Sequence, residues 1–380
     1  MSNKYTNDEK IEIENTDYLS EPGKGQEDEP LMEDPFNPNE INITSKPDTL
    51  RNLIERLKHD EIDLNTEFQR HAELWDNAKM SRLIESILIR FPLPAFYFDA
   101  TDEENWLVVD GLQRLSSIKK FIVDKKLKLH GLEYLKDFKG KGYDELPRKY
   151  KRRIDECPVT LFLIQPGTPE KVKYSIFRRI NTGGLVLNDQ EIRNAMTTRK
   201  VRKILSELAE DSYLKKTVGD QSRRMLDQEL ILRFLAFHFM DYSQTRKNIT
   251  VFLDEMVEQL KDASDARLHE YKTSFTQAVK RSWDIFGDLA FEKRTRGQTT
   301  RRRRKNSTLF EVWTTSLVKL SEDEMTLLIQ RREKLVRKHE DYVTDDNDYF
   351  RAITYSTQKK EHYAIRNEKV AQIIKETLNV

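Results

Sequence analysis

The stretch from Trp106 to Ser117 constrains the fold most, because a buried strand there leads directly into a helix. Four apolar residues in a row end at Asp110 and predict the strand. Leucine and isoleucine then recur every three to four residues from Leu112, which predicts a helix with one apolar face. Gly111 separates the two elements, and its missing side chain lets another group approach the backbone closely.

Two polar residues, Gln113 and Arg114, lie in the first turn of this predicted helix. A helix N-terminus carries free N–H groups and a partial positive charge, so it attracts anions. Arginine opposes that dipole, but its guanidinium binds phosphate oxygens in a bidentate fork. The Asp-Gly-x-Gln-Arg pattern therefore indicates a phosphate site. An ordinary strand-to-helix turn with a surface arginine is the alternative interpretation.

The composition is that of a soluble protein that can still bury a core. The chain has 380 residues, 34% charged and 37% hydrophobic, which corresponds to two or three domains. No apolar run approaches the roughly 18 residues of a membrane span, and the polar first ten residues do not resemble a secretory signal. The single cysteine, Cys157, excludes an internal disulfide. These features predict a cytoplasmic protein without membrane contact.

The charge is distributed unevenly along the chain. Residues 1–49 contain 4 Lys/Arg and 13 Asp/Glu, so the remaining residues are basic although the whole chain carries +1. A basic body is compatible with contact to nucleic acid or nucleotide, and solvated basic helices are the alternative. The sequence lacks a P-loop, a His-x-x-x-His pair and a Cys/His cluster, which argues against P-loop and zinc enzymes.

The periodicity predicts three regions: a disordered acidic tail over 1–46, a mixed domain over 47–200 and a helical domain over 201–380. The tail serves solubility or acts as a nucleic-acid mimic or docking arm. Helix signals begin at Ser45, Asp76 is a candidate cap for the helix that follows it, and Asn188 with Glu191 forms a capping-box pattern. The strands before Gly111 are expected to form a hairpin, and the helix over 225–242 is expected to be buried on several sides. The expected strands cover 95–99, 106–110 and 159–164. The expected helices cover 50–57, 80–88, 112–124, 168–180, 188–196, 225–242, 249–262, 267–287, 307–320, 322–339 and 361–377.

Two further segments gather polar or basic residues. The Arg179–Gly184 loop combines polar groups with two glycines, and it is either part of a site or a plain helix–helix connection. Residues 293–305 hold eight Lys/Arg and no acid. That run could track a phosphate backbone or be a solvated loop.

Several motifs in order resemble the domain-of-unknown-function family that forms the N-terminal half of GmrSD-type modification-dependent restriction enzymes. The resemblance covers residues of about 48–200, and the helical remainder is also similar around 224–227 and 350–353. The matching segments are Phe68-Gln69-Arg70 with Trp75, Leu83–Leu88, Phe91–Pro94, Val109–Leu115, Phe177–Gly184 and Glu191–Ala195.

The resemblance implies an α+β protein with a small ParB/sulfiredoxin-like mixed sheet followed by an all-helical domain. It also implies NTP binding, with hydrolysis and Mg²⁺ as further expectations. Asp110 and Gln113 would be catalytic, and Asp110 would bind the metal. Leu112 replaces a glutamine often found in the family, and this loss of a polar group favours nucleotide binding over turnover. The expected nucleotide-binding residues are Gln69, Arg70, Gly111, Arg114, Asn181, Gly183 and Gly184.

Three functions follow as hypotheses. The first is an NTP-binding regulatory or specificity subunit of a DNA restriction and phage-defence system. The second is a DNA-binding module that uses Arg70, Arg114 and the basic run, with Arg301, Arg302, Arg303 and Arg304 on DNA. The third is a ParB-like nuclease. Because the sequence lacks the histidine constellation of an HNH nuclease, a separate partner chain is expected to cut DNA. A homo-oligomer is compatible with the sequence as a further expectation.

Overall fold

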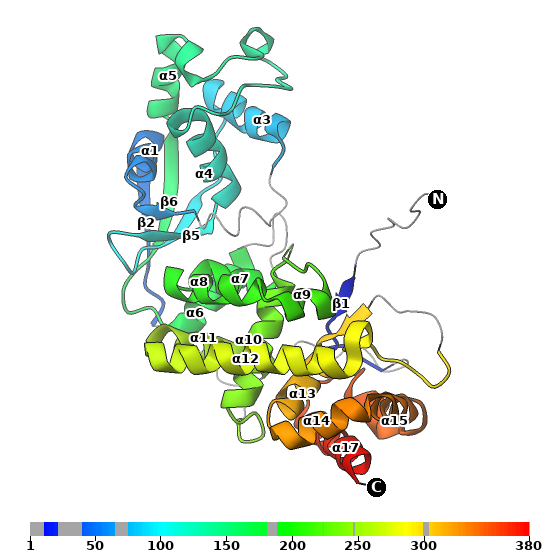
Figure 1. Cartoon of the computed structure of the whole chain (residues 1–380). Helices are drawn as coiled ribbons and strands as arrows, with labels where there is room; N and C mark the ends of the chain where they lie inside the picture. The colour runs from blue at the N-terminus through cyan, green and yellow to red at the C-terminus, as the bar shows by residue number, and fades with distance from the viewer. Residues whose placement is uncertain are drawn as a thin grey trace, which may run out of the picture. The chain divides into compact units, whose positions relative to one another are not determined.

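The structure is a computed structural model, and it describes residues 11–21, 40–64, 75–180, 188–222, 224–245, 248–298 and 304–379. The chain forms two compact units (Figure 1). The N-terminal unit comprises the described residues of Asp34–Met196. The helical unit comprises the described residues of Met1–Glu33 and Thr197–Val380.

A five-stranded mixed sheet forms the centre of the N-terminal unit. Its strand order is β2 (Ile43–Thr49), β6 (Pro158–Ile164), β4 (Phe96–Asp99), β5 (Trp106–Asp110) and β3 (Ile62–Asp63). β2 pairs antiparallel with β6, β6 parallel with β4, β4 antiparallel with β5, and β5 parallel with β3. The sheet confirms the predicted strands at 95–99, 106–110 and 159–164, including the hairpin that precedes the Gly111 turn.

Helices cover both faces of this sheet. Neighbouring residues Val108 and Val109 of β5 belong to different apolar clusters, as expected because successive side chains of a strand point to opposite faces. One face packs against α1 (Leu50–Lys58), α3 (Asn77–Leu88), α4 (Leu112–Ile118) and α5 (Arg148–Asp155). The other face packs against α6 (Glu170–Ile180) and α7 (Asp189–Met196). Short helical turns cover Lys119–Val123, Lys136–Phe138 and Tyr143–Glu145.

Local signals fixed the helix ends as predicted. Asp76 caps α3 by accepting a hydrogen bond from the backbone N–H of Lys79 at 2.7 Å. Asn188 and Glu191 form the predicted capping box, because each side chain accepts from the other residue's backbone N–H. The helix expected over 50–57 is confirmed as α1, but the signals that begin at Ser45 placed its start too early. Residues 43–49 form the edge strand β2, which is exposed along most of its length and therefore lacks an apolar alternation.

Helices build the second unit, which confirms the α+β class with a helical C-terminal region. α10 is apolar on several sides and buried, as predicted. No helix among the residues that the structure describes is long and apolar enough to cross a membrane. The helices are α8 (Arg199–Ala209), α9 (Ser212–Val218), α10 (Leu226–Phe239), α11 (Ile249–Asp262), α12 (Asp265–Phe286), α13 (Ser307–Leu317), α14 (Glu322–Gln330), α15 (Arg332–Asp345), α16 (Asn347–Ala352) and α17 (Lys360–Leu378), with a short turn at Gly287–Leu289.

The acidic N-terminal segment differs from the expected disordered tail where it is described. Residues 11–21 belong to the helical unit, and β1 (Glu12–Glu14) pairs in parallel with β7 (Arg304–Asn306). The acids of this segment meet basic partners far along the chain. The sequence could not reveal this, because the partners lie hundreds of positions away.

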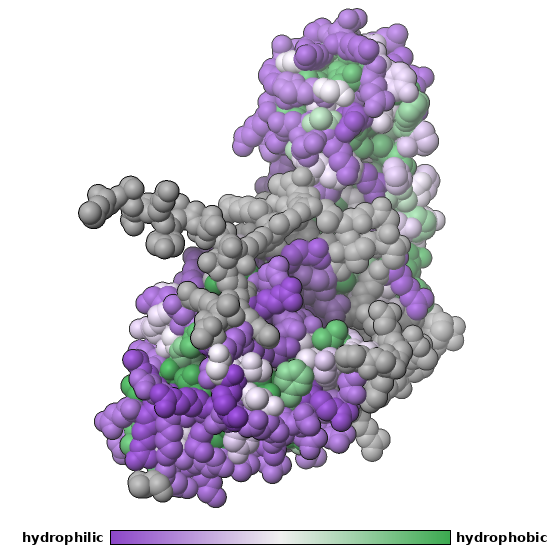
Figure 2. Space-filling model, turned by 90° about the vertical axis from the view of Figure 1, so that its right-hand side faces the viewer, coloured by the Kyte–Doolittle hydropathy of each residue, from purple (hydrophilic) through white to green (hydrophobic). Residues whose placement is uncertain are grey.

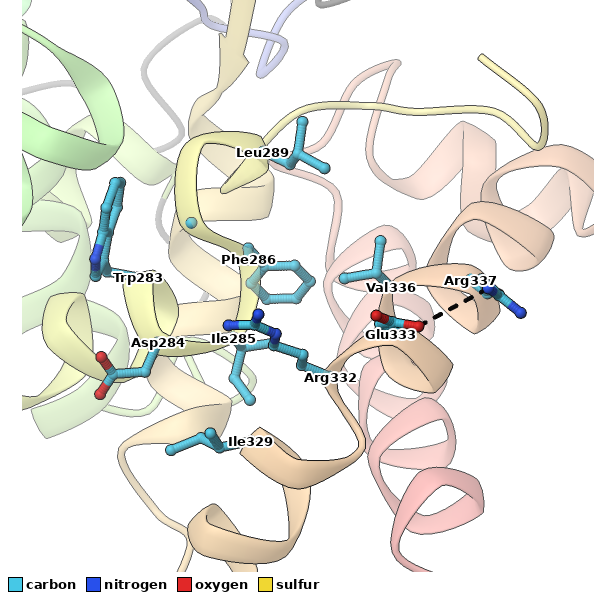
Figure 3. A pocket seen from close by; sticks show the side chains of 11 residues that line it. Trp283, Asp284, Ile285, Phe286, Leu289, Ile329, Arg332, Glu333, Val336 and Arg337 are labelled. Carbon is cyan, nitrogen blue, oxygen red and sulfur yellow. Dashed lines mark ion pairs between the residues drawn. The ribbon is translucent and has the colours of Figure 1, made fainter. Parts of the chain in front are cut away.

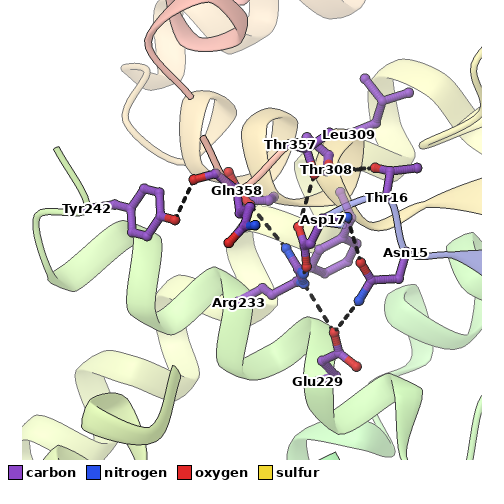
Figure 4. A network of polar contacts seen from close by, with 12 residues as sticks. Asn15, Thr16, Asp17, Glu229, Arg233, Tyr242, Thr308, Leu309, Thr357 and Gln358 are labelled. Carbon is purple, nitrogen blue, oxygen red and sulfur yellow. Dashed lines mark hydrogen bonds and ion pairs between the residues drawn. The ribbon is translucent and has the colours of Figure 1, made fainter. Parts of the chain in front are cut away.

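A buried network of charges holds this segment to the helices (Figure 4). Asp17 pairs with Arg233 of α10, which also contacts Glu311 of α13 at 3.3 Å. Glu311 accepts from Arg366 of α17 at 2.6 Å. The second oxygen of Asp17 accepts from the Thr357 hydroxyl at 3.0 Å. Because buried charges require partners, this network specifies how β1, α10, α13 and α17 assemble.

Candidate functional site

The turn between β5 and α4 forms around Gly111. Its φ of +104° lies in the left-handed region, which favours glycine. A Cβ atom at this position would overlap the ring of Phe96 on the neighbouring strand β4. The close approach expected from the sequence is therefore made by an aromatic ring of the same unit. The carbonyl of Gly111 then starts the helix by accepting from the N–H of Leu115 at 2.9 Å.

The Arg114 side chain extends back from α4 and stabilises the turn through hydrogen bonds. Its Nη2 donates to Asp110 Oδ2 at 2.7 Å and to the Ala95 carbonyl at 3.0 Å, and its Nη1 donates to the Pro94 carbonyl. The guanidinium stacks 4.5 Å from the centre of the Phe96 ring. Arg114 is 8% exposed. Burial lowers the pKa of Arg114, while the charge of Asp110 acts in the opposite direction.

Asp110 and Gln113 are the more open members of the motif. The Asp110 side chain keeps 34% of its surface exposed beside the Arg114 pair. Gln113 Oε1 accepts from the backbone N–H of Trp75 at 3.3 Å, which ties the turn to the segment before α3. Among the described residues, no group of three or more His, Cys, Asp or Glu side chains is placed to hold a metal ion. The carboxylate of Asp110 and the amide of Gln113 are thus the groups that a ligand could reach.

A second ion pair lies at the end of β4 and was not predicted. Asp99 Oδ2 contacts Lys173 Nζ of α6 at 2.9 Å, and both side chains are almost fully buried. Lys173 also donates to the Thr101 hydroxyl at 2.8 Å. The pair anchors α6 to the sheet. A signal was present, since Phe96–Asp99, like Trp106–Asp110, is an apolar strand that ends in aspartate.

Helix α7 buries several polar side chains beside β5. Gln190, Glu191, Arg193 and Asn194 are all less than 5% exposed. Arg193 Nη1 lies 3.4 Å from Gln190 Oε1. The sequence motif included Glu191, Arg193 and Asn194, but it missed Gln190. α7 thus buries four polar side chains, while its Ile192 and Met196 pack against the sheet.

The structure brings together the four motif residues 110, 111, 113 and 114. The other predicted nucleotide-binding residues lie outside the described residues; these are Gln69, Arg70, Asn181, Gly183 and Gly184. Three of the predicted DNA-binding residues, Arg301, Arg302 and Arg303, also lie outside them.

Every described Lys and Arg of the basic run over 293–305 forms an ion pair with an acidic side chain. Arg304, predicted to bind DNA, pairs with Glu12 at 3.1 Å in an exposed contact. The other pairs are Lys293–Glu14, Arg294–Glu340, Arg296–Asp341 and Lys305–Glu292. These described cations therefore contribute to internal ion pairs within the helical unit.

The helical unit carries a pocket of about 980 Å³ where α12 ends and α15 begins (Figure 3). Phe286 and Val336 form part of its apolar wall, and Arg332 and Arg337 belong to its lining. Glu333 and Arg337 form an ion pair across one turn of α15 at 3.9 Å. None of the sequence-predicted site residues lines this pocket.

Comparison with protein families finds a match over residues 50–198, to the N-terminal domain of the GmrSD restriction endonuclease. The matched range contains four of the five strands of the sheet, β2 lying just before it, together with the Gly111 turn, α6 and α7. Curated proteins and solved structures yielded no match. The family match covers the same region as the resemblance read from the motifs, and it confirms that residues 50–198 are similar to the GmrSD N-terminal domain.

Proposed function

We propose that this chain binds a nucleoside triphosphate at the Gly111 turn and acts as a regulatory or specificity subunit of a restriction system that acts on DNA. The GmrSD-type domain supports the DNA-directed part of this proposal. The observation that carries the nucleotide part is the arrangement of the Asp-Gly-x-Gln-Arg residues. A glycine-dependent turn presents an open carboxylate, and a buried arginine fixes that carboxylate in place.

Each residue of the turn takes a role in this proposal. Asp110 orients a water molecule or holds Mg²⁺, since Mg²⁺ in nucleotide sites commonly takes one or two carboxylates together with phosphate oxygens and water. A single open carboxylate fits that mode of binding. Gln113 would contact a phosphate or the attacking water through its amide. Arg114 acts mainly by positioning Asp110, because a phosphate would have to compete with this carboxylate for the guanidinium.

The proposal assigns DNA cleavage to another chain. The seven histidines of the sequence are scattered, without the constellation of an HNH nuclease. A subunit of this kind would control when its partner cuts, so NTP turnover should respond to DNA or to that partner. Such a subunit is expected to work in the cytoplasm.

The test measures binding of each NTP by the purified full chain, and phosphate release with and without DNA. Asp110→Asn keeps a hydrogen-bond acceptor for Arg114 but removes the charge, so we expect Mg²⁺-dependent nucleotide binding to fall at least about tenfold. The matched control is Asp102→Asn, which neutralises an exposed carboxylate of the same unit outside the turn. Asp102→Asn should bind nucleotide like the unaltered chain.

Two outcomes would contradict the proposal. One is that the unaltered chain binds no NTP under any of these conditions. The other is equal nucleotide binding by the Asp110→Asn and unaltered chains. Steeply salt-dependent DNA binding without NTP binding would instead favour a DNA-binding module, and metal-dependent cutting by the purified chain would favour a nuclease.

A further inference from the structure

The N-terminal unit has a basic segment that the nucleotide proposal does not use. Residues 119–153 contain 13 Lys/Arg and 5 Asp/Glu. The segment covers the loops after α4 and helix α5, which lie at the same end of the unit as α3 (Figure 1). The surface at that end is mostly hydrophilic, with a few hydrophobic patches (Figure 2).

Two aromatic side chains stand exposed beside this basic segment. Phe91 is 51% exposed and Tyr134 is 66% exposed, and they are among the few large hydrophobic side chains of the described chain that face solvent. Their rings meet edge to face, with centroids 6.3 Å apart. Exposed aromatic rings cost solvation free energy, so a contacting pair at the surface suggests a partner that covers it.

The backbone around both rings is fixed. Glu85 of α3 is buried, and its carboxylate accepts hydrogen bonds from the N–H groups of Glu133, Tyr134 and Leu135 at 3.0, 2.8 and 2.7 Å. On the other side, Arg90 ends the helix with a left-handed φ of +65°, and the N–H of Phe91 donates to the Ser86 carbonyl at 2.8 Å. The two rings are thus held in a defined position before any partner arrives.

Exposed cations flank the aromatic pair on both sides. Arg90 precedes Phe91, and Lys136 follows Tyr134 by two positions. Both are exposed, and neither forms an ion pair with another residue within the described ranges. This differs from the basic run of the helical unit, where the described cations are paired with acids. Free positive charge next to open aromatic faces matches a polyanion whose bases are unstacked.

We infer that the aromatic pair and its flanking cations, residues 90, 91, 134 and 136, form a contact surface for DNA with unstacked bases, either single-stranded or locally opened. A base stacks on the Tyr134 ring beside Phe91, while Arg90 and Lys136 contact the neighbouring phosphates. This inference rests on the proposed DNA-directed function, and it names residues that are not part of the Gly111 turn.

The experiment measures DNA binding by the full chain, using fluorescence anisotropy with labelled oligothymidylate and with a duplex of equal length over a series of salt concentrations. The unaltered chain should prefer the single strand. Tyr134→Ala should weaken its binding by about tenfold, while Tyr134→Phe should stay within about twofold, because the aromatic face provides the contact. Neither change should alter the salt dependence.

A cation variant separates phosphate contacts from stacking. Arg90→Asn removes the charge and suits the left-handed backbone, since asparagine tolerates that conformation. It should reduce the slope of log K against log salt by about 0.7, as expected for the loss of one phosphate contact on a single strand. Arg337→Gln, which removes an exposed cation of α15 in the helical unit, is the matched control and should bind DNA like the unaltered chain.

Three results would overturn the inference: equal binding of single strand and duplex, unchanged binding by both Tyr134→Ala and Phe91→Ala, or equal losses in Tyr134→Ala and Tyr134→Phe. These failures are distinguishable from failure of the proposed function. Tyr134→Ala should bind NTP without DNA like the unaltered chain, whereas Asp110→Asn should lose NTP binding and keep the preference for single-stranded DNA.

Discussion

Asp17 and Arg233 form a buried ion pair although they lie 216 positions apart in the sequence. Arg233 is also contacted by Glu229 and Glu311, and these acids raise the pKa of its guanidinium against the effect of burial. The arginine therefore stays charged in the interior of the helical unit. The acidic beginning of the chain thus contributes to the stability of helices near its end.

Removing Asp17 should destabilise the helical unit. Asp17→Ala leaves Arg233 buried with fewer counter-charges, and we expect the free energy of unfolding to fall by about 3 kcal/mol. Peptide-resolved hydrogen exchange measures this for each unit separately. Glu12→Gln is the control, because its pair with Arg304 is exposed and should contribute less than about 1 kcal/mol. Equal effects of the two substitutions would contradict the importance of the buried pair.

Gly111→Ala should destabilise the N-terminal unit by about 3 kcal/mol, because the new Cβ combines backbone strain with overlap of the Phe96 ring. Gly140→Ala is a matched comparison. Its φ is +81°, but a Cβ there meets no atom within 4 Å, so about 1 kcal/mol of strain is expected. Urea unfolding monitored by hydrogen exchange gives both values. A Gly111 variant as stable as the Gly140 variant would refute close packing at the turn.

Glu85 should make the N-terminal unit sensitive to acid. Burial raises the pKa of this carboxyl, but its three backbone hydrogen bonds outweigh burial and leave the pKa below its ordinary value. A carboxyl with a lowered folded-state pKa stabilises the fold above its unfolded pKa of about 4.3, and this contribution is lost as pH falls through the folded value. Glu85→Gln should therefore show a flatter loss of stability below about pH 4.3. A curve parallel to that of the unaltered chain would count against this role.

His339 should give the helical unit a different acid response. Burial lowers its pKa to about 4, in contact with the rings of Trp313 and Tyr349. Between the unfolded pKa of about 6.5 and pH 4, the unfolded chain binds more protons than the folded chain. The free energy of unfolding therefore falls by up to about 3 kcal/mol as the pH is lowered through this range. His339→Leu should remove most of this slope when unfolding is measured at several pH values. His238, whose pKa is also lowered by burial, remains in both proteins. An unchanged slope in His339→Leu would show that another group titrates.

Local features of this fold were predictable from the sequence, and long-range ones were not. The Gly111 turn, the Asp76 cap and the box formed by Asn188 and Glu191 depend on neighbours within four positions, so their signals are visible in the chain. The edge strand β2 could not be recognised, because its conformation depends on pairing with β6 across more than a hundred residues.

The candidate site likewise combines local features, which were predicted, with long-range contacts, which were not. Its residues at 110, 111, 113 and 114 were predicted from local pattern, and the structure brings them together. The carbonyls of Pro94 and Ala95 that bind Arg114 come from the preceding hairpin, and no pattern in the sequence indicated them. For the same reason Lys173 and Glu85 were missed, since each acts on a segment far away in sequence.

The pairing of β1 with β7 makes the helical unit discontinuous, with the N-terminal unit inserted between its two segments. During synthesis the inserted domain is complete once about half of the chain has left the ribosome, and it can fold at that stage as a unit. The first segment emerges earliest, but its partners Thr308 and Thr357 follow the inserted unit in the sequence. Asp17 therefore completes its contacts with Arg233 and Thr357 only after the inserted unit has been synthesised, so the helical unit closes at a stage when the N-terminal unit can already have folded.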